Sequence, residues 1–576
     1  MISRPLLSSE NTWRIINARL LTFTFTYCLF TFSLLHAQWP TTPDSSLLIG
    51  YGLFPEIISD GDGGAIVAFE ATIPSNEQVI KVKRVDKYGY LQWNGFSGVI
   101  AGGTGDEQHE HGIWEDGNGG VFVAFEDRTC IPDCGIPTAT IFSKVRVQQI
   151  DHAGNKLWGD GIAVTLTDSI RQNEPQVQPD GEGGCIVSWM DNRYSPNPLR
   201  YDVYVQRIDS SGNLCWGDSG IALTDSANLV RTSTPFMVVD EEGNTFLMYW
   251  DNSGYRVEKY SINGVKLWSN FEPLINQTPA LRLSDGNGGV YQASVVSDGN
   301  MIRIATQHLN SDGQKQWGEG GVVLVDSVNI NQSKVTGLVL NDQQNIFISY
   351  YYTQTDSPSV YLQKLTPQGT KLFPENGLSV SNFPSEKWGG GIIKSEDSLL
   401  YIWKNGYPAA NSFFAQKLDE NGNRLWGEDK AIAVFGSFTH DSNGGIITVA
   451  NIGNLEVVLS KLSKKGIIGE VLTSLITNEN NHLSTNFVIY PNYPNPFNSS
   501  TVIQFYLSAA AKVKLTIYNL LGQEIKTLID EKMLAGDHLR VWDGRNDFGE
   551  EVASGIYYYR LTITDQSKTN KMILIR

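Results

Sequence analysis

The sequence predicts an all-β protein in two parts, an eight-bladed or seven-bladed β-propeller followed by a small β-sandwich. Three observations lead to this fold class. A glycine-rich turn recurs along most of the chain, a second turn follows each copy and in seven of eight repeats is followed by an aromatic residue, and the repeats end before a different type of sequence begins near residue 487. Glycine (56 residues) and aromatic residues (11%) are abundant, and no long run of helix-forming residues at helical spacing is found. A chain of 576 residues suits one large repeat domain with one smaller domain.

The first repeated turn has the pattern D-G-x-G-G. Its glycines supply the positive φ that a tight hairpin needs, and its Asp can bond the backbone of its own turn. Each copy precedes a β-like run that in most repeats ends on an aromatic residue, such as Phe69 or Trp189. Four intact copies begin at Asp60, Asp116, Asp180 and Asp285, and four degraded copies begin at Asp240, Asn341, Lys394 and Asp441.

The second repeated turn has the pattern D-x-x-G and is followed by an aromatic residue. Its glycine is in phase in all eight repeats, although the last copy, SKKGIIGE, lacks the aromatic residue. Two hairpins per repeat give four strands, which is the content of a propeller blade. The aromatic residues are expected to fill the wedges between blades. Six of the 14 Trp share this position: Trp93, Trp158, Trp216, Trp268, Trp317 and Trp426.

Because successive strands alternate in direction, both repeated turns are expected on one rim of the ring. The other rim carries the variable loops, where functional groups concentrate on a rigid scaffold. We therefore predict a ligand site at the mouth of the central channel on this second rim, in blades 2 to 4. The candidate ligand-binding residues are His109, His111, Arg128, Glu174, Asp191 and Arg193.

Three motifs have alternative interpretations. The string DGDGG from Asp60 is similar to a calcium loop, but its sister copies do not keep the second Asp, which favours a hairpin turn. The pair His109 and His111 suits zinc, but no third ligand is identified, so an exposed polar loop is favoured. The Asp and Arg pairs after the second strands bind a ligand or fix their own loops. Neither a metal nor a cofactor is expected, and no catalytic residue is assigned.

The N-terminus, residues 1–37, has the features of a signal peptide: three Arg, an apolar stretch from Leu20 to Leu35 and a cleavage site after Ala37. A transmembrane anchor is the alternative, but the apolar stretch is short and contains several Thr. Removing three Arg and one Glu with this segment leaves 41 basic and 60 acidic residues, a net charge of −19. This charge argues against nucleic acid as a partner. In an oxidising compartment Cys130 and Cys134 are expected to form a disulfide.

Residues 477–486 form a polar linker between the predicted propeller, residues 38–476, and the C-terminal domain, residues 487–576. Read on its own, this domain is a small β-sandwich with Val513, Leu515 and Ile517 facing inward. Within the propeller, Cys185 and Cys215 are expected to be small core residues too far apart for a disulfide.

The C-terminal domain contains several short strings of proline, glycine and aromatic residues. Their residues are Pro494, Asn495, Pro496, Phe497, Gly522, Trp542, Asp543, Gly544, Gly555 and Tyr557. These strings resemble the sorting domain of type IX secretion cargo, itself similar to an immunoglobulin-like flagellar hook-capping domain. The resemblance implies export through the periplasm by the type IX machinery, removal of this domain, and a secreted or outer-membrane surface location, without a transmembrane anchor.

The sequence thus favours a non-catalytic propeller that binds extracellular polysaccharide or protein. The alternative is a propeller-type glycoside hydrolase or lyase, which requires two carboxylates converging in a pocket. A purely structural role is a third alternative, because fold alone does not determine function.

Overall fold

The computed structural model divides the chain into two compact units, Met1–Leu472 and Thr473–Arg576. The residues of the first unit that the structure describes are 39–40, 46–73, 77–103, 107–131, 140–167, 171–193, 201–224, 236–251, 254–271, 281–297, 302–326, 333–353, 358–381, 387–405, 413–432, 436–453 and 455–468. Those of the second unit are 487–489, 492, 495, 497–507, 510–533, 536–563 and 566–575. The predicted signal peptide and linker lie outside these ranges.

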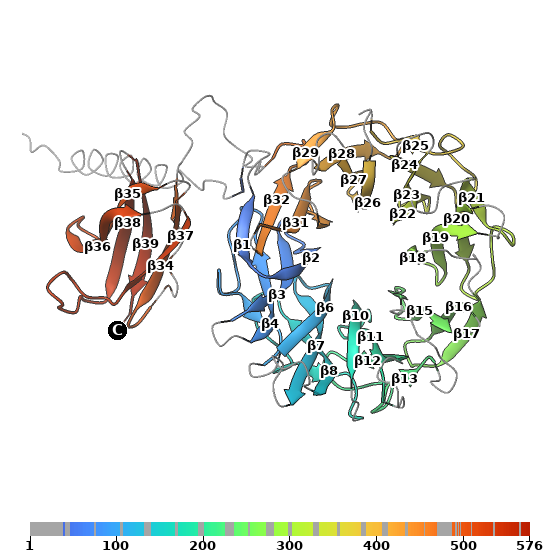
Figure 1. Ribbon diagram of the computed structural model, residues 1–576, viewed down its shortest axis with the longest axis horizontal. Helices are drawn as coiled ribbons and strands as arrows, with labels where there is room; N and C mark the ends of the chain where they lie inside the picture. Colours follow the sequence, from blue (N-terminus) through green and yellow to red (C-terminus); the bar gives the residue numbers. More distant parts are fainter. Residues whose placement is uncertain are drawn as a thin grey trace, which may run out of the picture. The chain divides into compact units, whose positions relative to one another are not determined.

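The first unit is a ring of eight four-stranded antiparallel sheets (Figure 1). The eight-bladed propeller is therefore confirmed. In seven blades the four strands follow one another in the chain from the central channel outward. In blade 8 the three inner strands do the same, but the outermost strand comes from the N-terminal end of the chain. The described residues contain strands and turns but no helix.

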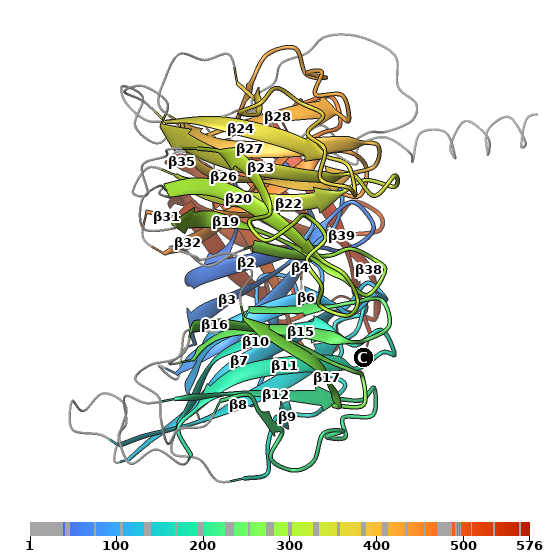
Figure 2. The same cartoon turned by 90° about the vertical axis from the view of Figure 1, so that its right-hand side faces the viewer.

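The blades are numbered in chain order. Blade 1 consists of β2 (Leu53–Ser59), β3 (Ala65–Thr72), β4 (Gln78–Val85) and β5 (Val99–Ile100); blade 2 of β6 (Glu107–Glu115), β7 (Val121–Ile131), β8 (Thr140–Ile150) and β9 (Ile162–Ala163). Blade 3 consists of β10 (Gln172–Pro179), β11 (Cys185–Asp191), β12 (Asp202–Ile208) and β13 (Ile221–Ala222); blade 4 of β14 (Phe236–Val239), β15 (Thr245–Asp251), β16 (Gly254–Tyr260) and β17 (Lys266–Phe271). Blade 5 consists of β18 (Leu281–Ser284), β19 (Val290–Ser297), β20 (Ile302–Leu309) and β21 (Val322–Val325); blade 6 of β22 (Lys334–Leu340), β23 (Ile346–Thr353), β24 (Pro358–Leu365) and β25 (Leu378–Ser379). Blade 7 consists of β26 (Lys387–Ser395), β27 (Ser398–Asn405), β28 (Phe413–Asp419) and β29 (Lys430–Ile432); blade 8 of β30 (Ser437–His440), β31 (Ile446–Ile452), β32 (Glu456–Leu462) and β1 (Leu47–Tyr51). The side view shows the long hairpin of β7 and β8 extending past the neighbouring blades (Figure 2).

The N-terminal strand β1 closes the ring by pairing with β32 as the outer strand of blade 8. We expected the eighth repeat to supply all four of its own strands, and this expectation is wrong. After the last turn, only an isolated bridge joins Leu462 to Ile468. Closing a ring with strands from both ends of the chain ties the first blade to the last, so the ring cannot open without breaking a sheet.

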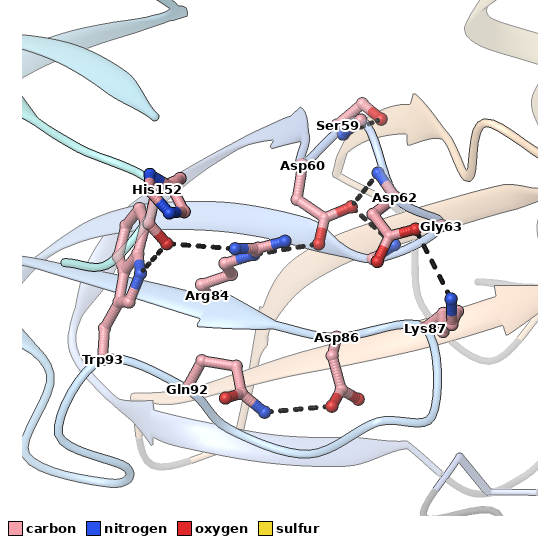
Figure 3. A network of polar contacts seen from close by, with 12 residues as sticks. Ser59, Asp60, Asp62, Gly63, Arg84, Asp86, Lys87, Gln92, Trp93 and His152 are labelled. Atoms are coloured by element: carbon pink, nitrogen blue, oxygen red, sulfur yellow. Dashed lines mark hydrogen bonds and ion pairs between the residues drawn. The ribbon is translucent and has the colours of Figure 1, made fainter. Parts of the chain in front are cut away.

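The D-G-x-G-G turns connect the first and second strands of a blade, as predicted. Asp60 Oδ1 accepts hydrogen bonds from the backbone N–H groups of Asp62 (2.9 Å) and Gly64 (2.7 Å), and its Oδ2 lies 3.0 Å from Arg84 Nε (Figure 3). The turn Asp thus stabilises its own loop and pairs with the third strand of the blade. The same two backbone hydrogen bonds form at Asp116, Asp180, Asp240, Asp285, Asn341 and Asp441.

The in-phase aromatic residues fill the wedges between blades, as predicted. Trp93 of blade 1 donates from Nε1 to the carbonyl oxygen of His152 in blade 2 at 3.0 Å (Figure 3), and it packs on the turn glycine of that blade, Gly154. A Cβ at Gly154 would lie 2.6 Å from the Trp93 ring, so glycine is required there for steric reasons as well as for its φ of 88°. Equivalent indole hydrogen bonds to the next blade are made by Trp216, Trp268, Trp317 and Trp426.

In five blades a buried Gln on the third strand accepts the backbone N–H of the in-phase aromatic residue, a feature that we did not anticipate. Gln148 Oε1 accepts the backbone N–H of Trp158 at 2.9 Å, and its Nε2 donates to the carbonyl oxygen of Gly159 at 2.8 Å. In blade 1 this position is Lys83, whose ammonium group donates to the carbonyl oxygens of Ile49 and Phe96. Burial lowers the pKa of Lys83 to about 7, and the charge of Lys81 adds to this effect. Other Gln residues in the same role are Gln206, Gln307, Gln363 and Gln416.

The outer strands are shorter and begin later than expected. In blade 3 the turn is followed by an isolated bridge between Ile208 and Leu214, and the fourth strand, β13, begins only at Ile221. Cys215 therefore lies before this strand and is exposed, whereas Cys185 is buried. The interpretation of Cys215 as a core residue is wrong, and both thiols are free.

The second unit is a β-sandwich of two sheets. A three-stranded sheet has the order β33 (Phe487–Ile489), β34 (Thr501–Leu507) and β37 (Gly536–Trp542). A four-stranded sheet has the order β36 (Glu524–Met533), β35 (Ala511–Asn519), β38 (Gly555–Ile563) and β39 (Gln566–Leu574). The inward orientation predicted for Val513, Leu515 and Ile517 is confirmed, since all three are fully buried in one core with the other sheet.

Candidate functional site

A cavity of about 480 Å³ lies on the rim opposite the repeated turns. It is formed by blades 1, 2 and 3, where inner strands begin and second strands end. Four of the six candidate residues predicted from the sequence line it, and blade 4, which was also expected to contribute, does not. Its lining residues are Phe54, Glu56, Glu70, His109, Glu110, His111, Arg128, Glu174, Pro175 and Gln176.

The cavity is shaped by β-bulges in three successive inner strands. The pairing register shifts between Leu53 and Glu56 in β2, between His109 and His111 in β6, and between Asn173 and Gln176 in β10. In each bulge one residue other than glycine has a positive φ: Phe54 (52°), Glu110 (38°) and Glu174 (51°). Such bulges redirect side chains and are common next to functional sites.

Carboxylates of the cavity hold these bulged strands together across the blades. Glu70 Oε1 accepts the backbone N–H of Glu110 at 2.9 Å, and Glu110 Oε2 accepts the backbone N–H of Glu174 at 2.9 Å. Glu56 Oε2 accepts the backbone N–H of Ile113 at 3.1 Å. Each bond links an acid to the inner strand of the next blade, so the acids are held in fixed positions before any ligand arrives.

The acidity of Glu56 is strongly altered in the cavity. Burial raises its pKa to about 7, and the hydrogen bond from Ile113 opposes this rise only in part. Burial also raises the pKa of Glu110, and the negative charge of Glu126 adds to the effect. Near neutral pH, the carboxyl group of Glu56 can thus hold or release a proton.

The pKa values of the two histidines shift in opposite directions. Burial disfavours the charged forms of both Glu70 and His109, but their mutual hydrogen bond and charge attraction, together with the backbone N–H of Glu110 and the side chain of Glu107, outweigh it. The pKa of Glu70 is therefore lowered and that of His109 is raised. Burial lowers the pKa of His111, and the negative charge of Glu70 and the nearby backbone of Ala68 oppose this shift only in part. The ring nitrogens of His111 are fully buried and make no well-formed hydrogen bond within the described ranges.

Arg128 is paired inside the protein. Its Nη2 lies 2.6 Å from Oε2 of Glu126, a side chain with 0% exposure, and 3.7 Å from Oε1 of Glu110. Its charge is therefore balanced by acids of its own blade. The guanidinium still lines the cavity.

Asp191 and Arg193 lie outside the cavity. Arg193 is 1% exposed; its Nη2 lies 2.6 Å from Asp191 Oδ2, and its guanidinium carbon lies 4.0 Å from the ring centroid of Tyr204. Asp191, which is also fully buried, accepts further hydrogen bonds from Trp189 and Gln172. This pair fixes its own loop, which was the alternative that the sequence left open.

The structure also bears on the calcium interpretation of the D-G-x-G-G turns and on the zinc interpretation of His109 and His111. The D-G-x-G-G Asp residues bond their own turns, as described above. Among the residues that the structure describes, no group of three His, Cys, Asp or Glu is arranged to hold a metal ion. The predicted disulfide of Cys130 and Cys134 is not tested, because Cys134 and the side chain of Cys130 lie outside the described parts.

Sequence reasoning missed Phe54, Glu56, Glu70 and Glu110. A signal for part of this set does exist: the residue six positions before the turn Asp is the bulged residue in all three blades, namely Phe54, Glu110 and Glu174. In blades 1 and 3 a proline follows this residue, and proline is common at bulges because it donates no ladder hydrogen bond.

The described motif residues of the C-terminal unit lie in its aromatic core, in its turns and at the start of a strand. Phe497 and Tyr557 pack against Trp542, with ring centroids 5.6 and 5.2 Å away, respectively. Asn495 Oδ1 accepts the backbone N–H of Ile573 at 2.8 Å, which ties the start of the domain to its last strand. Gly522 and Gly544 have positive φ, Gly555 begins β38, and Asp543 pairs with Lys526. Pro494 and Pro496 lie outside the described residues.

Within the described part of the chain, no helix is long and apolar enough to cross a membrane.

A comparison with curated protein sequences finds no significant match. Among solved structures, the chain is similar to PorZ, a bacterial surface component of the type IX secretion system of Porphyromonas gingivalis, with 9% identity over 93% of this chain and 100% of that chain and a TM-score of 0.19. It is similar to the polysaccharide lyase Uly1, with 10% identity over 62% and 90% of the two chains and a TM-score of 0.36. An α-L-arabinanase of Penicillium chrysogenum complexed with arabinobiose has 15% identity over 51% and 93% and a TM-score of 0.28. Residues 495–567 match the family described as the FlgD Ig-like domain, so the C-terminal sandwich is an immunoglobulin-like domain of this type.

Proposed function

We propose that the protein is exported by the type IX secretion system and acts outside the cell, where its propeller binds polysaccharide in the cavity of blades 1 to 3. The observation that carries the binding proposal is the combination of an open cavity, an aromatic side chain at its edge and carboxylates held by backbone hydrogen bonds. Phe54 is 66% exposed and offers a ring face on which a sugar can lie. Fixed carboxylates accept hydrogen bonds from hydroxyl groups at little entropic cost.

The export proposal rests on the C-terminal unit. Its motifs resemble those of type IX sorting domains, and the residues of these motifs form the aromatic core and the turns of the sandwich. Deleting residues 486–576 is expected to leave the propeller in the periplasm, while the full chain reaches the cell surface or the medium. Fractionation of cells that express the two forms provides the measurement, and normal secretion of the shortened form would refute the assignment.

The binding proposal is tested by screening the chain from Gln38 to Arg576 against a polysaccharide array. A bound glycan should lose affinity when Phe54 is changed to Ala. Changing Leu166, an exposed apolar residue outside the cavity lining, to Ala serves as the matched control. Equal loss in both variants, or none in either, contradicts binding at this cavity.

A glycoside hydrolase or lyase is the second candidate function. The observation that favours it is Glu56, whose pKa of about 7 suits a general acid at neutral pH. The discriminating measurement is the release of reducing ends or unsaturated products from whichever polysaccharide binds. If the rate of product release disappears in Glu56→Gln while binding persists, catalysis is established. If no product forms with the parent protein, only the binding function remains.

A further inference from the structure

The charges that line the cavity are predominantly negative. Four carboxylates face it, Glu56, Glu70, Glu110 and Glu174, whereas the only Lys or Arg in the lining is Arg128. That guanidinium is already paired with Glu126 and Glu110. The excess negative charge on the whole chain, −17, extends the same field outward. An anionic polysaccharide is therefore repelled from this site, and a cationic group is attracted.

Glu56 retains unused hydrogen-bonding capacity for a ligand. It uses Oε2 to accept the backbone N–H of Ile113, and no described residue bonds its Oε1. His111 also lines the cavity, but its ring nitrogens are buried, so a ligand cannot reach them unless the ring moves.

The exposed ring of Phe54 supports the same choice of ligand. Its bulged backbone places it at the margin of the acidic cavity, and an aromatic face attracts cations as well as the apolar face of a sugar. A ring beside carboxylates is a combination that suits a positively charged sugar. It has no particular advantage for a uronic acid or a sulfated sugar.

We propose that the cavity selects a polysaccharide with free 2-amino groups, whose ammonium binds between Glu56 and the neighbouring carboxylates. This inference rests on the proposed polysaccharide-binding function and adds the chemical class of the ligand. The cavity volume of about 480 Å³ lies within the range of small-molecule binding sites, so it can hold a sugar unit.

The proposal has a consequence for protons. Glu56 is partly protonated near neutral pH, and a cation at its carboxylate favours the ionised form. Binding is therefore accompanied by proton release from Glu56. The other titratable groups that face the site are Glu70 on β3, His109, Glu110 and His111 on β6, Arg128 on β7 and Glu174 on β10. The number of protons released by Glu56 is the difference in proton release between the parent protein and a variant in which only Glu56 is changed.

The test is isothermal titration of the chain from Gln38 to Arg576 at pH 6, in two buffers of different ionisation enthalpy. The probes are the β-1,4-linked hexamer of glucosamine, its fully N-acetylated counterpart, a hexamer of galacturonate and hexalysine. We expect the glucosamine hexamer to bind at least about tenfold more tightly than the N-acetylated hexamer, with affinity falling as salt rises. Glu56→Gln should weaken this binding about tenfold and reduce the proton release, and Glu319→Gln, a change on the exposed surface of blade 5, should do neither.

Each other result has a defined meaning. Equal affinity for the two glucosamine-based hexamers supports polysaccharide binding but overturns selection of the ammonium group. Preferential binding of the galacturonate hexamer also supports polysaccharide binding and overturns this selection. Binding of hexalysine without any glycan overturns both the amino-sugar assignment and the polysaccharide function. If Glu56→Gln does not fold, Glu110→Gln provides the second variant. Unchanged affinity in a folded variant at both positions overturns the proposed ammonium site.

Discussion

Trp39 Nε1 donates a hydrogen bond to the carbonyl oxygen of Lys87 at 3.0 Å. The acceptor is the residue after Asp86 in the D-x-x-G turn of blade 1, the same position that the wedge indoles of other blades reach in the following blade. Trp39 is 1% exposed and joins the core between blades 8 and 1. It therefore supplies the aromatic residue that the eighth repeat lacks, and the N-terminal segment provides both the last strand and the last wedge of the ring.

Changing Trp39 to Ala should lower the free energy of unfolding by about 3–5 kcal/mol, since it removes a buried indole at the closure point. Changing Trp39 to Phe should cost less, because it keeps most of the packing and loses mainly the hydrogen bond, worth about 1 kcal/mol. Urea denaturation provides the measurement. The control is Trp114→Ala, at a Trp that is 42% exposed. A Trp39 variant no less stable than this control would contradict the closing role.

Gly154 should tolerate Ala less well than Gly217 does. Both have a positive φ, 88° and 80°, so both substitutions cost about 1–2 kcal/mol in backbone strain. At Gly154 the added Cβ also meets the Trp93 ring at 2.6 Å, whereas at Gly217 it meets nothing within 4 Å. We expect Gly154→Ala to be the less stable variant by a further 1–3 kcal/mol, roughly the cost of overpacking. Equal melting temperatures would mean that the blades adjust freely at this wedge.

The blade count was predictable because each blade repeats the same steric requirements. A turn glycine with positive φ, such as Gly154, recurs in all eight repeats, and the aromatic residue of the wedge recurs in seven of them. The closure was not predictable, because Trp39 lies far in the chain from the repeat that it completes and has no periodic partner. The repeats show that each blade requires a turn glycine and a wedge aromatic residue. They do not show which distant segment supplies the aromatic residue and the outer strand that the eighth repeat lacks.

The site was predictable only in part. His109, His111, Arg128 and Glu174 were found because polar residues are conspicuous before and after strands on the variable rim. Arg193 was included for the same reason, yet its side chain turns into the protein to reach Asp191. Sequence does not distinguish an arginine that points to the channel from one that supports a loop. The carboxylates from blade 1, Glu56 and Glu70, were missed because the hydrogen bonds that join them to blade 2 are long-range.

Arg128 and Arg193, both singled out from the sequence, should each affect stability. Each neutralises a carboxylate of 0% exposure, Glu126 or Asp191. Removing one partner of a buried ion pair costs about 3–5 kcal/mol. We expect each Ala variant to melt at a lower temperature, and Glu126→Gln to restore part of the loss in Arg128→Ala. Arg193→Ala should leave ligand affinity unchanged in the folded fraction, whereas Arg128→Ala should alter it. Full stability in both Ala variants would show that these carboxylates are not buried as described.

Glu56 should make the protein less stable as pH rises. Its pKa is about 7 in the folded chain against an ordinary value of 4.5, so between these values the folded state keeps a proton that the unfolded state has lost. Stability therefore falls as pH increases from about 4.5 to 7 and is constant above, by up to about 3 kcal/mol from this group. Glu56→Gln should equal the parent near pH 4 and exceed it at pH 8, as measured by urea denaturation without ligand. Glu319→Gln, at an exposed carboxylate, should show no such difference between the two pH values. A constant difference between Glu56→Gln and the parent across this range would mean that Glu56 is ionised throughout, and that its burial does not control its charge.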